Sequence, residues 1–218
     1  MPKSRNEQTE QAIRSAALRL FLERGYSATS YTDLASCSGV SRTLVQRYYP
    51  RKDLLAVGCV AAVREAAVRA CDEAFASEAH PLVRLYLRGQ VNVATYSTCE
   101  GIRRLMTDVL RDRDLTRKAI AEGFRWTMAE ALPDAAQTGE EEPPDELLMA
   151  MGGLYEVVYA YLVREEMPRV ASCTLPSVLT FAQLNAIQMP SEGMEVHAIT
   201  NEALLPLAKR AVDLVEWH

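Results

Sequence analysis

A chain of 218 residues is long enough to bury a substantial core without disulfides or a structural metal. Hydrophobic residues make up 49% of it and charged residues 24%, which excludes a disordered or fibrous protein. The formal net charge of −5 is uneven: residues 1–55 hold nine Lys/Arg and five Asp/Glu, a net charge of +4, so the remainder carries −9. A cationic N-terminal segment followed by an anionic remainder predicts a polyanionic partner for the N-terminal segment only.

The first predicted element is an amphipathic helix. Apolar residues recur at helical spacing from Ile13 to Phe21, which places them on one helical face. Gly25 follows and is suited to end the helix, since glycine adopts the left-handed conformation that a helix C-terminus requires.

Two short helices are predicted next, separated by a glycine turn. Ser30 and Asp33 have the S-x-x-D spacing of a capping box, which predicts a helix start. This helix cannot easily pass Gly39, and Ser41 is suited to cap a third helix that runs to about Tyr48. Two short helices joined by such a turn form a helix-turn-helix, whose second helix fits the DNA major groove.

The rest of the chain also predicts helices and no strands. Pro50 ends the third helix, and a long helix begins near Arg51 with only Gly58 as an interruption. Further helices are expected at roughly 81–98, 101–112, 115–131, 145–166, 176–188 and 201–217. The predicted fold class is therefore all-α, with a helix-turn-helix domain over residues 1–55 and a larger helical domain over residues 56–218.

The third helix carries the side chains expected to read DNA. Residues near the N-terminus of such a helix reach base edges, and here these positions are rich in hydrogen-bond donors. They are Ser41, Arg42, Thr43, Gln46 and Arg47. A charged run of this length also suits an ordinary solvated face, but its position after a glycine turn in the cationic part of the chain favours DNA binding.

Residues 10–56 resemble the N-terminal DNA-binding domain of the TetR family of bacterial transcriptional regulators. The resemblance rests on "AALRLFLERGY", "TSYTDLASCSGVS" and "YYPRKDLL", which keep the family spacing without a gap from Gly25 to Leu55. It implies that Thr29, Ser30 and Lys52 contact DNA phosphates. It also implies that Arg42, Thr43, Arg47 and Tyr48 face DNA.

The chain departs from the family pattern within the third helix. Where the family usually has glycine, threonine, leucine and tyrosine in succession, this chain has Thr43, Leu44, Val45 and Gln46. The substitution at Gln46 removes an expected phosphate contact and supplies an amide suited to adenine. Leu44 either packs inward or touches a thymine methyl group. These positions therefore bear on the operator sequence, not on the fold.

By the same resemblance, the larger domain carries a small-molecule pocket. Large or adaptable side chains on expected inner faces are candidates to line it, although such residues at helical spacing more often belong to an ordinary core. They are Tyr96, Met106, Phe124, Met128, Met151, Tyr155 and Tyr159.

The resemblance further implies a homodimer formed by two C-terminal helices of each copy. The stretch 147–163 is too apolar for a lone surface helix, and Gly152 and Gly153 permit the close approach of another helix. Because Glu156 lies in its middle and it is short for a membrane span, we expect an interface formed by the helix near 145–166 and the helix after Pro176.

Other classes of protein have less support. The three histidines are scattered, the chain has no nucleotide-binding or hydrolase motif, and no catalytic residue, metal site or cofactor is expected. Five cysteines without a C-x-x-C pair, together with a polar N-terminus, indicate a cytoplasmic protein with reduced thiols.

The predicted function is a sequence-specific DNA-binding regulator, a repressor released from a palindromic operator by a small molecule. The alternatives are a helical ligand-binding protein, an enzyme or an adaptor without sequence-specific DNA binding.

Overall fold

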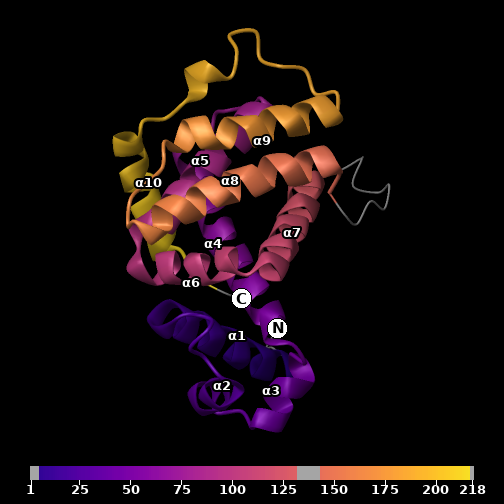
Figure 1. Cartoon of the computed structure of the whole chain (residues 1–218), viewed down its shortest axis with the longest axis vertical. Helices are drawn as coiled ribbons and strands as arrows, with labels where there is room; N and C mark the ends of the chain where they lie inside the picture. Colours follow the sequence, from indigo (N-terminus) through magenta and orange to yellow (C-terminus); the bar gives the residue numbers. More distant parts are fainter. Residues whose placement is uncertain (1–4, 132–142, 217–218) are drawn as a thin grey trace.

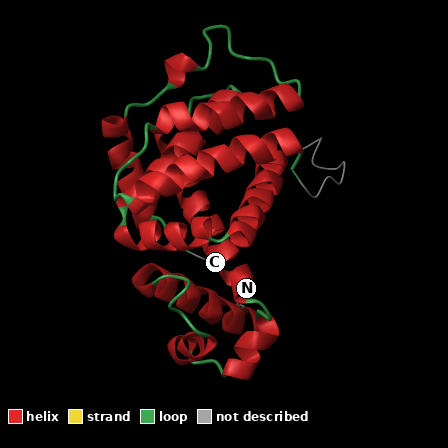
Figure 2. Cartoon of the chain, in the orientation of Figure 1, coloured by secondary structure: helices red, strands yellow, loops and turns green. Residues whose placement is uncertain are grey.

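The computed structural model describes residues 5–131 and 143–216, in which every regular element is a helix (Figures 1 and 2). The predicted all-α class is confirmed. The helices are α1 (Arg5–Arg24), α2 (Tyr31–Ser38), α3 (Arg42–Tyr48), α4 (Lys52–Ala74), α5 (Pro81–Thr98), α6 (Glu100–Arg111), α7 (Arg113–Ala131), α8 (Asp145–Val163), α9 (Val170–Leu184), the 3-10 helix η2 (Glu195–His197) and α10 (Asn201–Asp213).

The three N-terminal helices form a small unit at one end of the molecule (Figure 1). The predicted capping box is present, because the Ser30 hydroxyl accepts from the Asp33 amide while the Asp33 carboxylate accepts from the Ser30 amide. Gly39 ends α2 with φ of 70°, a conformation that glycine adopts without strain. Ser41 then caps α3 by accepting from the Leu44 amide. Local capping and turn chemistry thus set the angle between α2 and α3.

Helix α4 joins the small unit to the rest of the molecule. It contacts α1 at one end and also packs against α5, α6, α7 and α10 (Figure 1). A boundary between residues 55 and 56 lies inside this continuous helix. A displacement of α4 is therefore transmitted directly to both parts of the chain.

The predicted start of the helix after Pro176 is wrong. Helix α9 begins at Val170 and contains Pro176 in its second turn. The helix persists because one proline removes one amide donor, whereas buried residues on both sides of it, Val170, Thr174, Val178 and Phe181, anchor both halves. Pro206 is likewise inside α10.

The small unit also rests on α6, whose N-terminal turn passes very close to the end of α1. Arg104 donates to the carbonyl oxygens of Leu22 at 2.9 Å and Glu23 at 2.6 Å. A Cβ atom added at Gly101 would lie 2.7 Å from the Leu22 carbonyl oxygen, so only glycine permits this approach. The backbone amide of Ser27 donates to Asp108 of α6 at 2.9 Å.

Gly101→Ala is expected to lower the free energy of unfolding by about 1–3 kcal/mol, because the added methyl group forces α6 away from α1. Gly89→Ala is the matched control, since its added Cβ has no atom within 4 Å and alanine favours the helix by about 1 kcal/mol. Urea denaturation of both variants measures the difference. Equal stability of the two variants would contradict the proposed tight contact.

Candidate DNA-binding surface and ligand pocket

Helix α3 presents a row of exposed donor side chains. Arg42, Thr43, Gln46 and Arg47 are exposed, and their side chains make no hydrogen bond or ion pair with other described residues. Val45 lies on the opposite face and is buried, which fixes the rotation of the helix. This half of the helix surface is therefore free to meet an external partner.

Hydrogen bonds made by two tyrosines, Tyr31 and Tyr49, hold the end of α3 in place. Tyr49, directly after α3, is 8% exposed and belongs to the core. Its hydroxyl accepts from Arg14 Nε at 2.9 Å and donates to Glu10 at 3.1 Å. Tyr31 of α2 donates to the Tyr49 carbonyl oxygen at 2.8 Å. The end of α3 is thus bonded to both α1 and α2, and Tyr48 beside it stays half-buried.

The structure corrects the expectation for Thr29. This residue is 2% exposed, and its hydroxyl donates to the Gly25 carbonyl oxygen at 2.8 Å. Its side chain therefore stabilises the turn between α1 and α2 instead of facing outward. Ser30 is exposed at the N-terminus of α2, but its hydroxyl is occupied by the capping box.

Lys52 also has internal partners that the sequence did not indicate. Its ammonium donates to the carbonyl oxygens of Tyr26 and Thr29, both at 2.8 Å, and lies 4.1 Å from the centre of the Tyr26 ring. Burial lowers the pKa of this lysine. Lys52 therefore ties the start of α4 to the α1–α2 turn.

Lys52→Met is expected to lower the free energy of unfolding by about 1–3 kcal/mol, because it leaves two carbonyl oxygens without their charged donor. Methionine keeps most of the apolar stem, so the change isolates the ammonium. Lys209→Met, at an exposed position of α10, is the matched control. If thermal unfolding shifts equally in both variants, the internal role of Lys52 is wrong.

The larger part of the chain contains a partly open cavity of about 130 Å³ between α4, α5, α7, α8 and α9. Four of the predicted pocket residues line it, namely Tyr96, Phe124, Met151 and Tyr155. Burial raises the pKa values of Tyr96 and Tyr155, so both phenols stay neutral in the physiological range.

Three predicted pocket residues lie elsewhere. Met106 is 1% exposed and belongs to the core on α6. Met128 packs half-buried against the core, and the Tyr159 hydroxyl accepts from Arg111 at 3.5 Å. Neither residue lines the cavity. Helical spacing identified inward positions, but it did not distinguish the cavity from the surrounding core.

The polar side of the cavity was not predicted. Arg64 of α4 is 9% exposed, and both its terminal nitrogens donate to the Glu122 carboxylate. Although burial opposes it, this pairing holds the pKa of Arg64 above its ordinary value. The guanidinium lies 5.0 Å from the Trp126 ring centre, and Arg88, paired with Asp72, lies 5.9 Å from it. The sequence contains one sign of this polar side, because Arg64 occupies an inward position of a mainly apolar helix.

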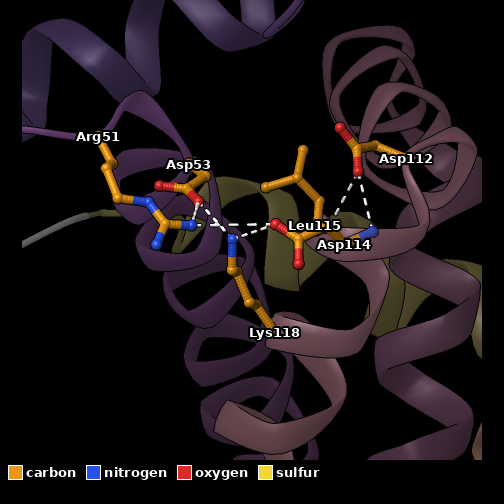
Figure 3. A network of polar contacts seen from close by, with 6 residues as sticks. All are labelled: Arg51, Asp53, Asp112, Asp114, Leu115 and Lys118. Carbon is orange, nitrogen blue, oxygen red and sulfur yellow. Dashed lines mark hydrogen bonds and ion pairs between the residues drawn. The ribbon is translucent and has the colours of Figure 1, made fainter.

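A second charged cluster connects α7 to the start of α4 (Figure 3). The Lys118 ammonium binds Asp53 at 2.5 Å and also pairs with Asp114, while Arg51 pairs with Asp53 from the other side. Although burial opposes it, the hydrogen bonds from Lys118 and Arg51 hold the pKa of Asp53 below its ordinary value. Asp112 caps α7 by accepting from the amides of Asp114 and Leu115.

The arrangement of α1 to α4 agrees with a known family. Residues 13–58 match the family model described as bacterial regulatory proteins of the tetR family. Residues 13–58 are therefore a tetR-family domain. The helix-turn-helix and its exposed donor side chains therefore belong to a DNA-binding domain.

A solved structure shares the fold of this chain at low sequence identity, and another is similar to it. A TetR transcriptional regulator from Rhodococcus sp. RHA1 is 18% identical, with a TM-score of 0.53, and the match covers 83% of this chain and 100% of that one. The fatty acid degradation regulator FadR from Bacillus halodurans is also 18% identical, with a TM-score of 0.46 and coverage of 78% and 96%. No curated protein matches this sequence.

Exposed large apolar side chains form a set on the neighbouring helices α8 and α9. Its members are Met149, Val157 and Val163 on α8 and Leu179 and Leu184 on α9. We call these five residues the α8–α9 face. A Cβ added at Gly152 or Gly153 meets no atom within 4 Å, so the backbone of α8 is open to a neighbour there.

The length and composition of α8 alone would allow it to cross a membrane. Its contacts with α6 and α9, however, leave Val158 and Leu162 buried. A helix with apolar residues on both its buried and its exposed sides is typical of one that lies between a core and a partner surface.

Proposed function

We propose that this regulator is a cytoplasmic homodimeric repressor that binds a palindromic operator and is released when a small molecule occupies the cavity. The observation that carries the proposal is the exposed set of donors on α3, in the cationic end of an acidic chain. Guanidinium and amide groups in such positions suit the acceptor edges of guanine and adenine.

The roles of the α3 residues follow from their exposure and chemistry. Arg42, Gln46 and Arg47 reach base edges, whereas Thr43 and the half-buried Tyr48 contact the backbone or a base. Ser30 and Ser41 have their hydroxyls engaged in caps, so the backbone amides at these helix starts are the groups offered to phosphates. Lys52 fixes the α1–α2 turn through two hydrogen bonds. Its contact with a DNA phosphate stays a prediction from the family resemblance.

Dimerisation through the α8–α9 face supports the palindromic operator. A two-fold axis pairs these apolar residues with their own copies, forming a bundle of four helices. The two recognition helices then meet half-sites about 34 Å apart, which is one turn of DNA.

Release by a ligand requires a connection between the cavity and α3, and two contacts supply it. Helix α7 lines the cavity through Phe124 and Trp126 and holds Asp53 of α4 through Lys118. Helix α6 holds the end of α1 through Arg104. A ligand that favours a shifted α7 would move the start of α4 and thereby change the spacing of the recognition helices.

Selection of DNA sites from a random pool, followed by titration of the selected site against salt, tests the proposal. We expect one preferred palindrome, with log affinity falling linearly in log salt. A protein that binds all sequences equally, or none, would instead be a ligand-binding protein, adaptor or enzyme.

A further inference from the structure

Two residues that line the cavity each carry a buried polar atom without a partner. Among the described residues, Arg64 Nε and Asn92 Oδ1 are buried and make no hydrogen bond. Both residues line the cavity, and Arg64 is 9% exposed. The other end of the Asn92 amide donates to the Tyr96 hydroxyl at 2.8 Å, which fixes the direction of its oxygen. These two residues thus supply one unused donor and one unused acceptor beside the cavity.

The charges in this wall are already balanced. Glu122 binds both terminal nitrogens of Arg64, and Asp72 binds Arg88 through two hydrogen bonds at 2.8 and 2.6 Å. An anionic ligand would add a third negative charge beside two neutralised pairs in a poorly solvated space. Burial of an unpaired charge is strongly unfavourable, so the site favours a neutral molecule.

The size and lining of the cavity limit the body of the ligand. A volume of about 130 Å³ is close to that of an apolar protein cavity that admits benzene. Phe124, Trp126 and Phe181 contribute aromatic surface to the wall. Such walls suit the faces and edges of one ring.

We propose that the effector is a neutral, ring-sized apolar molecule with one group that both accepts and donates a hydrogen bond, such as a phenolic hydroxyl or a carboxamide. The group accepts from Arg64 Nε and donates to Asn92 Oδ1, and the ring lies against the aromatic wall. This inference rests on the proposed role of the cavity as the effector site.

Two pairs of probes of equal size test the proposal by isothermal titration calorimetry on the full chain. Phenol is expected to bind about tenfold or more tightly than toluene, because toluene leaves the two buried atoms unsatisfied. Benzamide is expected to bind about tenfold or more tightly than benzoate at pH 7. Toluene equal to phenol, benzoate equal to benzamide, or no binding of any probe at millimolar concentration would each overturn the proposal.

A matched pair of variants tests the named contact. Asn92→Leu is expected to reduce the preference for phenol over toluene to less than about threefold, because the acceptor is lost. Asn185→Leu makes the same change at a half-buried asparagine that does not line the cavity, and it should keep the full preference. An unchanged preference in Asn92→Leu overturns the assignment. If that variant does not fold, the four-probe comparison on the unmodified chain decides the matter.

Operator binding by the ligand-free protein, measured in the same preparation, separates this proposal from the proposed function. Release of a selected operator by benzoate and not by benzamide would refute the effector class while the regulator stands. Tight phenol binding without any selected DNA site would refute the regulator role and leave the ligand class intact.

Discussion

Arg47→Ala is expected to lower the affinity for a selected operator by about 30-fold or more and to abolish the preference at one base position in each half-site. A bidentate arginine–guanine contact contributes about 1–3 kcal/mol of discrimination, and a dimer makes it twice. Arg47 is exposed on α3 and pairs with no described residue, so its loss leaves no internal partner unsatisfied. Fluorescence anisotropy with the selected operator and with single-position variants of it measures both effects.

Two further substitutions show which property of Arg47 matters. Arg47→Lys keeps the charge but loses the planar fork, so it should restore binding to random DNA more fully than base preference. Arg84→Ala removes one exposed charge on α5, far from α3, and should leave both unchanged (Figure 1). If Arg47→Ala weakens binding to all sequences equally, the side chain contacts a phosphate and not a base.

The DNA-binding domain was largely predictable because its signals are local. Ser30 and Asp33 are three residues apart, Gly39 needs only its own backbone conformation, and Ser41 caps the turn that follows it. The partners of Lys52 were not predictable, since they are carbonyl groups 23 and 26 residues earlier. Every residue has a backbone carbonyl oxygen, so the sequence does not indicate which of them a lysine contacts.

The cavity was only partly predictable for the same reason. Arg64 and Glu122 are 58 residues apart, and their pairing depends on how α4 and α7 pack. Aromatic and methionine residues at inward positions looked alike in the sequence, yet Tyr155 lines the cavity while Met106 is core. Whether an inward residue lines the cavity or belongs to the core depends on where the packed helices leave a space. That is set by the packing of all the helices together.

Val157→Glu is expected to convert the protein to a monomer at micromolar concentration and to lower operator affinity by at least about 100-fold. Val157 is 41% exposed on the α8–α9 face. In a two-fold interface the new carboxylate is buried without a partner, which disfavours association by about 3–5 kcal/mol. Each separated protomer then contacts one half-site and loses the gain from simultaneous binding.

Sedimentation equilibrium and operator titration measure the two consequences of Val157→Glu independently. Val196→Glu is the matched control, because Val196 is 65% exposed in η2, outside the α8–α9 face, and the same change there should leave a dimer with full affinity. A Val157→Glu protein that remains dimeric would place the interface elsewhere. A monomer that still binds the palindrome at full affinity would instead show that the two half-sites are read without a preformed dimer. The proposed coupling between the cavity and the half-site spacing would then be wrong.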